Sequence, residues 1–327
     1  MIITQTPFRM SFFGGGTDFP AFYNEHGGSV ISSTFNKYCY VTARKIPPFF
    51  DYQNEMVYSR IERTKKVEDI IHPLIREGMI WKNLNELRVT YEGDLPARTG
   101  LGTSSSFAVG MLLAFEALKG KYIDKQKLAE EAIYLERTLC NESGGVQDQI
   151  AASFGGLNRI DFNNSGFQVT PIIIRKQRKE ELNRNLMLFF TGFSRFSSDI
   201  QEVHQASIKE KEVQLMNIYS LVDQAESILV GNGDLSDFGR LLDDAWKLKR
   251  GINNLVSSST IDDLYSRALD AGAIGGKLLG AGGGGFLLFY VEEDRQDEVR
   301  QVLKHLKEVP FRFEDIGTRI LYYKPEE

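Results

Sequence analysis

The chain has 327 residues, of which 42% are hydrophobic and 25% are charged, and its formal net charge is −5. This composition is ordinary for a globular protein of two domains, and it offers no overall attraction to nucleic acid or to an anionic membrane, so neither is an expected partner. Two distant cysteines, Cys39 and Cys140, indicate neither a disulfide framework nor a zinc site, and with no signal-peptide pattern we expect a cytoplasmic monomer or homodimer.

The first half of the chain begins with strand-like segments. Apolar and polar residues alternate over residues 2–13, 29–46 and 87–95, with glycine, proline and polar turns between them. From Ser104 the spacing of apolar residues becomes helical, and Gly120 is a plausible end for this helix. A second helix is predicted over residues 124–140.

The second half mixes helices with strands. We predict strands at 167–175 and 185–192, split by the charged residues 176–184, where we place a lobe boundary. Helices follow at about 198–229, 234–251, 261–271 and 294–306, and strands at 286–291, 309–315 and 318–323. The pattern predicts an α+β fold with domains at residues 1–178 and 179–327.

A cluster of glycines and hydroxyls precedes the first predicted helix, at Gly100, Leu101, Gly102, Thr103, Ser104, Ser105 and Ser106. Glycines leave main-chain N–H groups uncovered, and hydroxyls add donors at a helix N-terminus, where the helix dipole favours an anion. The pattern is typical of a phosphate-binding loop, although an ordinary N-cap would use the same residue types. Neither a Walker A motif nor a GxGxxG motif after a strand is present.

Two other stretches are rich in glycine. Residues 6–20 place three glycines after a strand, and Asp18 beside Thr17 could accept hydrogen bonds from neighbouring hydroxyls of a sugar or form an Asx-turn. Residues 275–289 concentrate glycine directly before an apolar strand, a position that disfavours a flexible linker.

Taken in chain order, the three stretches resemble the motifs of the GHMP kinases, the superfamily of galactokinase, homoserine kinase and mevalonate kinase. The residues that carry the resemblance are P-x-R-x4-GGGTD at 7–18, P-x3-GLGTSSS at 96–106 and KLLGAGGGGF at 277–286. The resemblance implies an N-terminal lobe like the second domain of ribosomal protein S5, a ferredoxin-like C-terminal lobe, and ATP and its acceptor in the cleft between them.

The resemblance also implies a role for each motif. The loop 100–106 would wrap the ATP triphosphate, with Arg98 either adding a contact to phosphate or pointing to solvent. The glycines of the third motif, including Gly282 and Gly283, would support that loop and approach the acceptor. The acceptor would also meet the first motif, at Gly15, Gly16, Thr17 and Asp18.

Two carboxylates complete the implied arrangement. Asp148 would take the acceptor proton or orient the hydroxyl, steadied by Arg9, and Mg²⁺ on Ser104 and Glu136 would bridge the β- and γ-phosphates. From the residues alone, Glu136 could instead be a helix-flank residue that reaches water, and Asp148 could be a plain N-cap.

The GGGTD form of the first motif resembles the heptose phosphate kinases within this superfamily. It implies transfer to C1 of D-glycero-D-manno-heptose 7-phosphate, for the synthesis of GDP-heptose. A phosphorylated acceptor needs a cationic end to its pocket, for which Lys37 and Arg195 are candidates, with solvated surface charges as the alternative.

Three rivals stay open at this point. The acceptor could be fucose or an unphosphorylated heptose, the reaction could be a decarboxylation of the mevalonate diphosphate type, or the chain could be a silent sensor of sugar and ATP.

Overall fold

The computed structural model describes residues 1–97, 99–192, 209–253 and 255–325. Its strands are β1 (Ile2–Phe13), β2 (Gly28–Lys45), β3 (Asn54–Val57), β4 (Ile61–Thr64), β5 (Leu87–Gly93), β6 (Leu157–Asn163), β7 (Gly166–Pro171), β8 (Leu186–Phe190), β9 (Gly275–Leu278), β10 (Phe286–Tyr290), β11 (Lys307–Glu308), β12 (Phe313–Glu314) and β13 (Arg319–Tyr323). Its helices are α1 (Pro20–His26), α2 (Pro73–Trp81), α3 (Thr103–Leu118), α4 (Lys125–Tyr134), α5 (Gln147–Phe154), α6 (Lys176–Asn185), α8 (Glu212–Val230), α9 (Ser236–Arg250), α10 (Ser259–Asp270) and α11 (Gln296–Val302).

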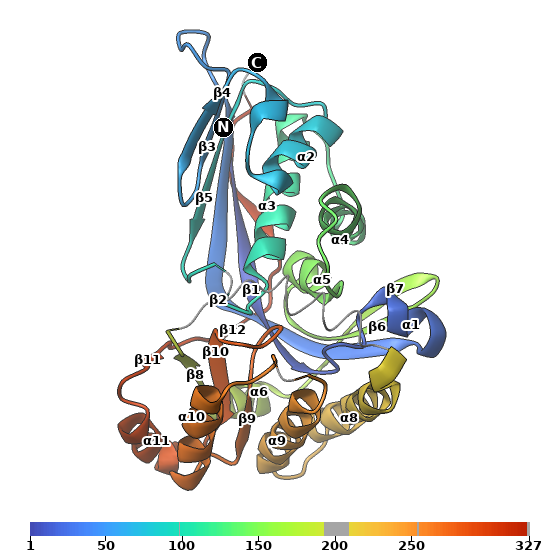
Figure 1. The fold of residues 1–327 in the computed structure, drawn as a ribbon, viewed down its shortest axis with the longest axis vertical. Coiled ribbons are helices and arrows are strands. Elements are labelled where there is room, and N and C mark those ends of the chain that lie inside the picture. The colour runs from blue at the N-terminus through green and yellow to red at the C-terminus, as the bar shows by residue number, and fades with distance from the viewer. Residues whose placement is uncertain (98, 193–208, 254, 326–327) are drawn as a thin grey trace.

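Two sheets organise the described part of the chain, one in each lobe (Figure 1). The larger sheet joins nine strands along the path β13-β1-β2-β5-β3-β4, with β6, β7 and β12 attached through β2. The smaller sheet has four antiparallel strands in the order β11-β8-β10-β9. The fold is the two-lobed α+β arrangement that the sequence predicts.

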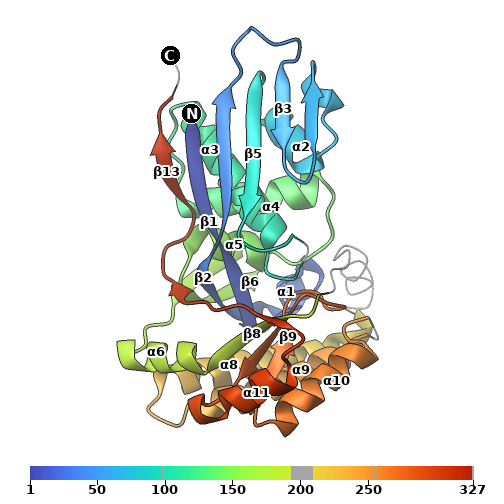
Figure 2. The same ribbon diagram turned by 90° about the vertical axis from the view of Figure 1, so that its left-hand side faces the viewer.

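The helices α2, α3, α4 and α5 all lie on one side of the larger sheet (Figure 1), and a view of the opposite face shows the strands in front of them (Figure 2). The α3 helix packs on β1 and β2, and its side chains Phe107, Met111 and Phe115 are buried, as their helical spacing predicts. Gly120, with a φ of 64°, follows the helix in the left-handed conformation that glycine adopts without strain. The N-terminus of α3 is the end of the helix that lies nearer to the second lobe (Figure 1).

Two segments near the end of the chain return to the larger sheet. The β13 strand pairs with β1, so that Ile2 lies opposite Tyr323, and β12 pairs with β2. These strands follow the smaller sheet in the sequence, yet they extend the first lobe. The predicted boundary between residues 178 and 179 stays a prediction.

Several elements differ from those expected. Residues 176–184, which we interpreted as a charged boundary, belong to α6, in which only Leu182 and Asn185 are buried. So few buried residues leave no apolar stripe for sequence reasoning to detect. The helix predicted over 124–140 changes at Leu135 into a π-helical turn, Leu135–Leu139. The short elements α1, α2, β3 and β4 were not predicted.

In the second lobe, α8, α9, α10 and α11 accompany the four-stranded sheet. The glycine-rich residues before β10 include a separate strand, β9, and a turn joins the two strands so that Leu278 lies opposite Leu287. The third glycine motif is therefore the tip of a hairpin. Across the ranges that the structure describes, no helix is both long enough and apolar enough to cross a membrane.

Candidate active site between the two lobes

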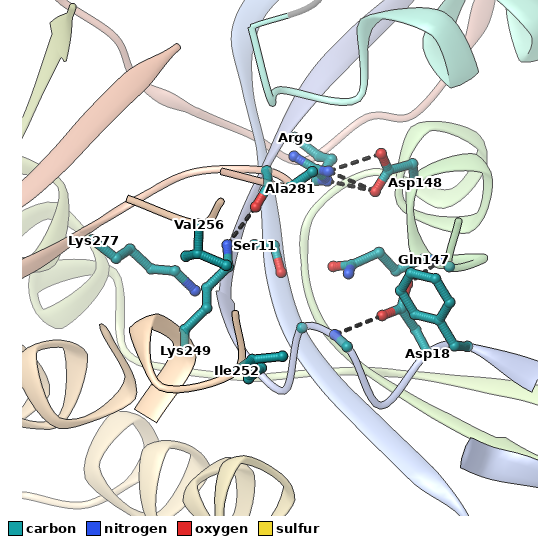
Figure 3. Close-up of a pocket in the computed structure, with 15 residues that line it drawn as sticks. Arg9, Ser11, Asp18, Gln147, Asp148, Lys249, Ile252, Val256, Lys277 and Ala281 are labelled. Carbon is teal, nitrogen blue, oxygen red and sulfur yellow. Dashed lines mark hydrogen bonds and ion pairs between the residues drawn. The ribbon is translucent and has the colours of Figure 1, made fainter. Parts of the chain in front are cut away.

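A cavity lies where the two lobes meet, and it encloses about 710 Å³, including space open to solvent. The first lobe contributes residues from β1, from the turn at 14–18 and from the start of α5. The second lobe contributes residues from α9, from the segment after it, from β9 and from the hairpin tip at Gly280 and Ala281. Figure 3 shows the side chains of both lobes facing this space.

A bidentate ion pair in the cavity joins Arg9 of β1 to Asp148 of α5. The Nε and Nη2 atoms of Arg9 donate to the two carboxylate oxygens of Asp148, each at 2.8 Å, and Nη1 donates to the carbonyl of Gly100 at 2.7 Å. The Arg9 side chain is 5% exposed and that of Asp148 is 20% exposed. Asp148 lies inside the first turn of α5, whose N-cap is Val146, so the side chain is held by Arg9 rather than serving as a cap. A small molecule in the cavity can therefore reach a carboxylate whose orientation is fixed.

The second and third glycine motifs pack against each other beside this pair. A Cβ atom on Gly100 would overlap the backbone of Leu279, and a Cβ atom on Gly280 would overlap the backbone of Gly100. Both residues have a positive φ, 82° and 76°. Gly102, the N-cap of α3, has a φ of 71°, and a Cβ atom there would lie 3.3 Å from Asp148 Oδ2. Only glycine allows this loop to lie so close to both the hairpin tip and the catalytic candidate.

The hydroxyls of the loop face different ways. Ser106 Oγ donates to the carbonyl of Pro7 at 3.0 Å, and Ser105 Oγ donates to Glu136 at 2.7 Å, so both bind within the protein. Thr103 is buried and Ser104 is exposed. The N–H groups of the first turn of α3 have no acceptor within the helix. Of the four hydroxyls expected to face phosphate, only that of Ser104 is exposed, because the other three side chains are buried. The groups that remain available to bind phosphate are therefore the backbone N–H groups and Ser104.

Glu136 is buried in the π-helical turn, with 1% of its surface exposed, so it is not a flank residue that reaches water. Its Oε2 accepts hydrogen bonds from Ser105 Oγ and from Gln149 Nε2. Burial raises the pKa of Glu136, against the lowering effect of Arg137 and of these hydrogen bonds. The serine that binds Glu136 is thus Ser105, whereas the motif resemblance implies that Ser104 shares a magnesium ion with Glu136.

This donor set fits a magnesium ion. Mg²⁺ is usually held by one or two carboxylates together with phosphates and water, and here a buried carboxylate stands beside the first turn of α3. In the same cluster the side-chain oxygen Oε1 of Gln149 is buried without a hydrogen-bond partner. An oxygen-seeking cation would satisfy both groups.

The first motif forms the floor of the cavity at Gly15, Gly16 and Asp18. Asp18 is 2% exposed, and it accepts hydrogen bonds from the N–H of Gly16 at 3.0 Å and from the N–H of Gln147 at 3.3 Å. Burial, together with the charge of Asp148, raises the pKa of Asp18. Thr17, by contrast, is fully buried and its hydroxyl binds Gly14 and Ser29, so it holds the turn together.

Two lysines of the second lobe line the cavity although sequence reasoning did not select them. Lys249 belongs to α9, and its Nζ donates to the carbonyls of Gly280 and Leu278. Lys277 belongs to β9, is 5% exposed, and donates to the carbonyl of Phe12 at 2.6 Å. Burial and neighbouring cations lower the pKa of both groups, that of Lys249 to about 8.

Some predicted site residues lie elsewhere. Lys37 lies in β2, opposite a register shift between Pro7 and Phe8 of β1, and it does not line the cavity. Gly282 and Gly283 pack against Val256, which itself lines the cavity, whereas the lining residues of this loop are Gly280 and Ala281. Arg98 and Arg195 lie outside the described residues.

The sequence matches two family models. Residues 66–156 match the GHMP kinases N terminal domain, and residues 224–308 match the GHMP kinases C terminal model. The two matches lie in the same order as the two lobes. They include the loop 100–106, Asp148, Lys249 and the third glycine motif.

Known proteins similar to this chain agree with these models. A D-glycero-alpha-D-manno-heptose 7-phosphate kinase from Campylobacter jejuni is 30% identical over 318 residues, which cover 93% of each chain. The crystal structure of a D-glycero-D-manno-heptose 1-phosphate kinase from Bacteroides thetaiotaomicron superposes with a TM-score of 0.80 at 25% identity, over 98% of this chain and 99% of that one. The mevalonate kinase of Methanococcus jannaschii shares the fold, with a TM-score of 0.72 at 18% identity over 95% and 98% of the two chains.

Proposed function

The chain belongs to the GHMP kinase family, and from this membership we propose that it transfers the γ-phosphoryl group of ATP to the C1 hydroxyl of D-glycero-D-manno-heptose 7-phosphate. Enzymes of this family are ATP-dependent phosphotransferases that act on alcohol groups, and this chain is a sugar kinase among them. Its route would be the synthesis of GDP-heptose. The similarity to the Campylobacter jejuni enzyme supports heptose 7-phosphate as the acceptor.

One observation carries the chemical part of the proposal: the bidentate Arg9–Asp148 pair lies directly beside Gly102 of the phosphate-binding loop. A nucleotide whose phosphates bind the N–H groups of that loop would bring its terminal phosphorus to the edge of the cavity. Asp148 would then face an acceptor hydroxyl in the cavity, where it accepts the proton or orients the oxygen for in-line attack.

The remaining residues would position the two substrates. Asp18 would accept hydrogen bonds from sugar hydroxyls, since it lines the same cavity as Asp148. Arg9 would hold Asp148 and place positive charge beside the transferring group. Glu136 and Ser104 would hold Mg²⁺, which when bound would neutralise charge on the β- and γ-phosphates. Closing the two lobes around the substrates would exclude water, which would otherwise compete with the sugar for the phosphoryl group.

The experiment that tests this proposal follows the new phosphate. The protein is incubated with MgATP and a panel that contains heptose 7-phosphate, the unphosphorylated heptose, fucose and hexose phosphates, and ³¹P NMR locates the product signal. We expect a second phosphate on C1 of heptose 7-phosphate, with matching release of ADP. Transfer to another sugar would replace the proposed acceptor, and no transfer to any sugar would contradict the proposal as a whole.

A further inference from the structure

The second-lobe wall of the cavity carries two ammonium groups that are matched by no carboxylate. Lys249 and Lys277 both line the cavity, and their Nζ atoms donate to backbone carbonyls of Gly280, Leu278 and Phe12. Among the residues that the structure describes, neither lysine forms an ion pair. Each ammonium group has three N–H donors, so Lys277 keeps two for another acceptor after its bond to Phe12.

The other charges of the cavity do not offset this pair. Arg9 and Asp148 neutralise each other through two short hydrogen bonds. Asp18 attracts Lys249 less than Arg9 repels it, and the net effect of burial and charge is to lower the pKa of both lysines. Buried cations without a counter-charge are costly, so an arrangement of this kind is stabilised when an anion enters.

This positive wall belongs to the second lobe, whereas the loop proposed to meet the nucleotide belongs to the first, although Lys249 binds Gly280, which packs on Gly100 of that loop. The loop lies beside Asp148 at Gly102, on the first-lobe side. Figure 3 shows Lys249 and Lys277 on the opposite side of the cavity from Asp18, Gln147 and Asp148. An acceptor that spans the cavity therefore meets carboxylates at one end and ammonium groups at the other.

Unpartnered polar atoms also line the cavity. Ser11 Oγ and Gln147 Oε1 are buried without a hydrogen-bond partner, and both side chains line the cavity. Ser11 is 6% exposed and Gln147 is 8% exposed, so they are shielded from bulk water. A sugar ring with several hydroxyls would satisfy such groups, which favours placing the carbohydrate part of a ligand at Ser11 and at the end that holds Asp18, Gln147 and Asp148.

We propose that Lys249 and Lys277 form the subsite that holds the phosphate already present on the acceptor, and so select a sugar phosphate over the free sugar. This inference rests on the proposed sugar kinase function and assigns the recognition of the 7-phosphate. It replaces Lys37 as the candidate for that contact. Ile252 and Val256 also line the cavity. They would limit the access of water to the ion pairs that the lysines form with a bound phosphate.

The test measures binding rather than turnover. Isothermal titration calorimetry without nucleotide compares heptose 7-phosphate, mannose 6-phosphate and fructose 6-phosphate with the matching unphosphorylated sugars. The variants are Lys249→Met and, as a matched control on the same helix, Lys247→Met, whose lysine is 58% exposed and pairs with Asp243. Lys277→Met is the second test variant. For every variant, thermal unfolding and a separate measurement of ATP binding report whether the protein is folded.

We expect wild type and Lys247→Met to bind a phosphorylated sugar more tightly than its unphosphorylated form. In Lys249→Met this preference should shrink about 10- to 100-fold, since a charge-assisted hydrogen bond is lost, while ATP affinity stays unchanged. If Lys249→Met fails to fold, the same loss of preference is required of Lys277→Met.

Three outcomes overturn the inference: no phosphorylated sugar binds more tightly than its free form, both test variants keep the preference, or the lysine substitutions weaken ATP instead. The last result would place the lysines on the transferring phosphate. Failure of the proposed function appears separately, as the absence of a C1 phosphate in the NMR experiment although sugar phosphate binding persists.

Discussion

Asp148→Asn removes one negative charge from the centre of the proposed site while it preserves the shape of the side chain. In the wild type both oxygens accept hydrogen bonds of 2.8 Å from Arg9. Asparagine keeps one acceptor, but its amide NH₂ would meet an Arg9 donor, so one charge-assisted bond is lost. The other Arg9 contact, 2.7 Å to the carbonyl of Gly100, is retained. The loop should therefore stay in place.

The magnitude follows from these contacts. Positioned proton transfer contributes about 10²- to 10⁴-fold in rate. The proton of the acceptor hydroxyl would compete with the Arg9 guanidinium for the Asp148 carboxylate, so we expect the lower end of this range. This is a fall in kcat of about 10²-fold, or a rise of about 2.7 kcal/mol in the activation free energy. Losing one charge-assisted bond should also lower the free energy of unfolding by roughly 2 kcal/mol and the Tm by roughly 3 °C.

The assay couples ADP release to a spectrophotometric readout, and calorimetry measures ATP affinity separately. Asp161→Asn is the matched control, because Asp161 also pairs with an arginine, Arg159, but is 37% exposed and lies on β6 outside the cavity. Asp223 and Glu226 still neutralise Arg159 in that variant. The reasoning is refuted if Asp148→Asn retains kcat to within about twofold, or if both variants lose it equally.

Three further results are expected. Asp18→Asn should raise the KM for the sugar about tenfold or more and leave the KM for ATP unchanged, as steady-state kinetics would measure; a larger effect on ATP would place Asp18 elsewhere. Gly280→Ala should destabilise the fold by about 2–4 kcal/mol in denaturant unfolding, because its Cβ would overlap Gly100, whereas Gly120→Ala, with a φ of 64° and nothing within 4 Å, should cost only about 1 kcal/mol; equal losses would contradict the packing argument. Burial and the charge of Arg9, opposed by Asp18, together lower the pKa of Lys249 to about 8, so affinity for a sugar phosphate should fall as pH rises through about 8, approaching tenfold per pH unit; Lys249→Met should show a smaller fall in this range, and an unchanged fall would contradict the assignment.

Much of the fold and part of the site follow from local patterns in the sequence. Helical spacing located α3, and the clustering of glycine and hydroxyls located the loop at its N-terminus. The motif resemblance brought Arg9 and Asp148 into one site, and the structure places them in direct contact. The role of each residue remains a proposal.

The two lysines were missed for identifiable reasons. Lys277 begins the third motif, but only the glycines of that motif were given a role, because a β9–β10 hairpin cannot be recognised from a run of glycines. Lys249 did carry a signal: Phe238, Leu242 and Ala245 are buried at helical spacing, and the next positions of this stripe are Lys249 and Ile252. A lysine on an apolar stripe is a candidate for a site, yet its distance from Asp18 depends on how the lobes meet, which no local pattern contains.

Because β13 lies beside β1, the sheet of the first lobe is complete only after residues 319–323, which follow the second lobe in the sequence, have been synthesised. The free edge of β1 would stay exposed while the second lobe forms, which favours slow maturation and makes chaperone protection during translation valuable. Removing residues 319–323 should accordingly damage the first lobe, to which the N-terminal strand β1 belongs.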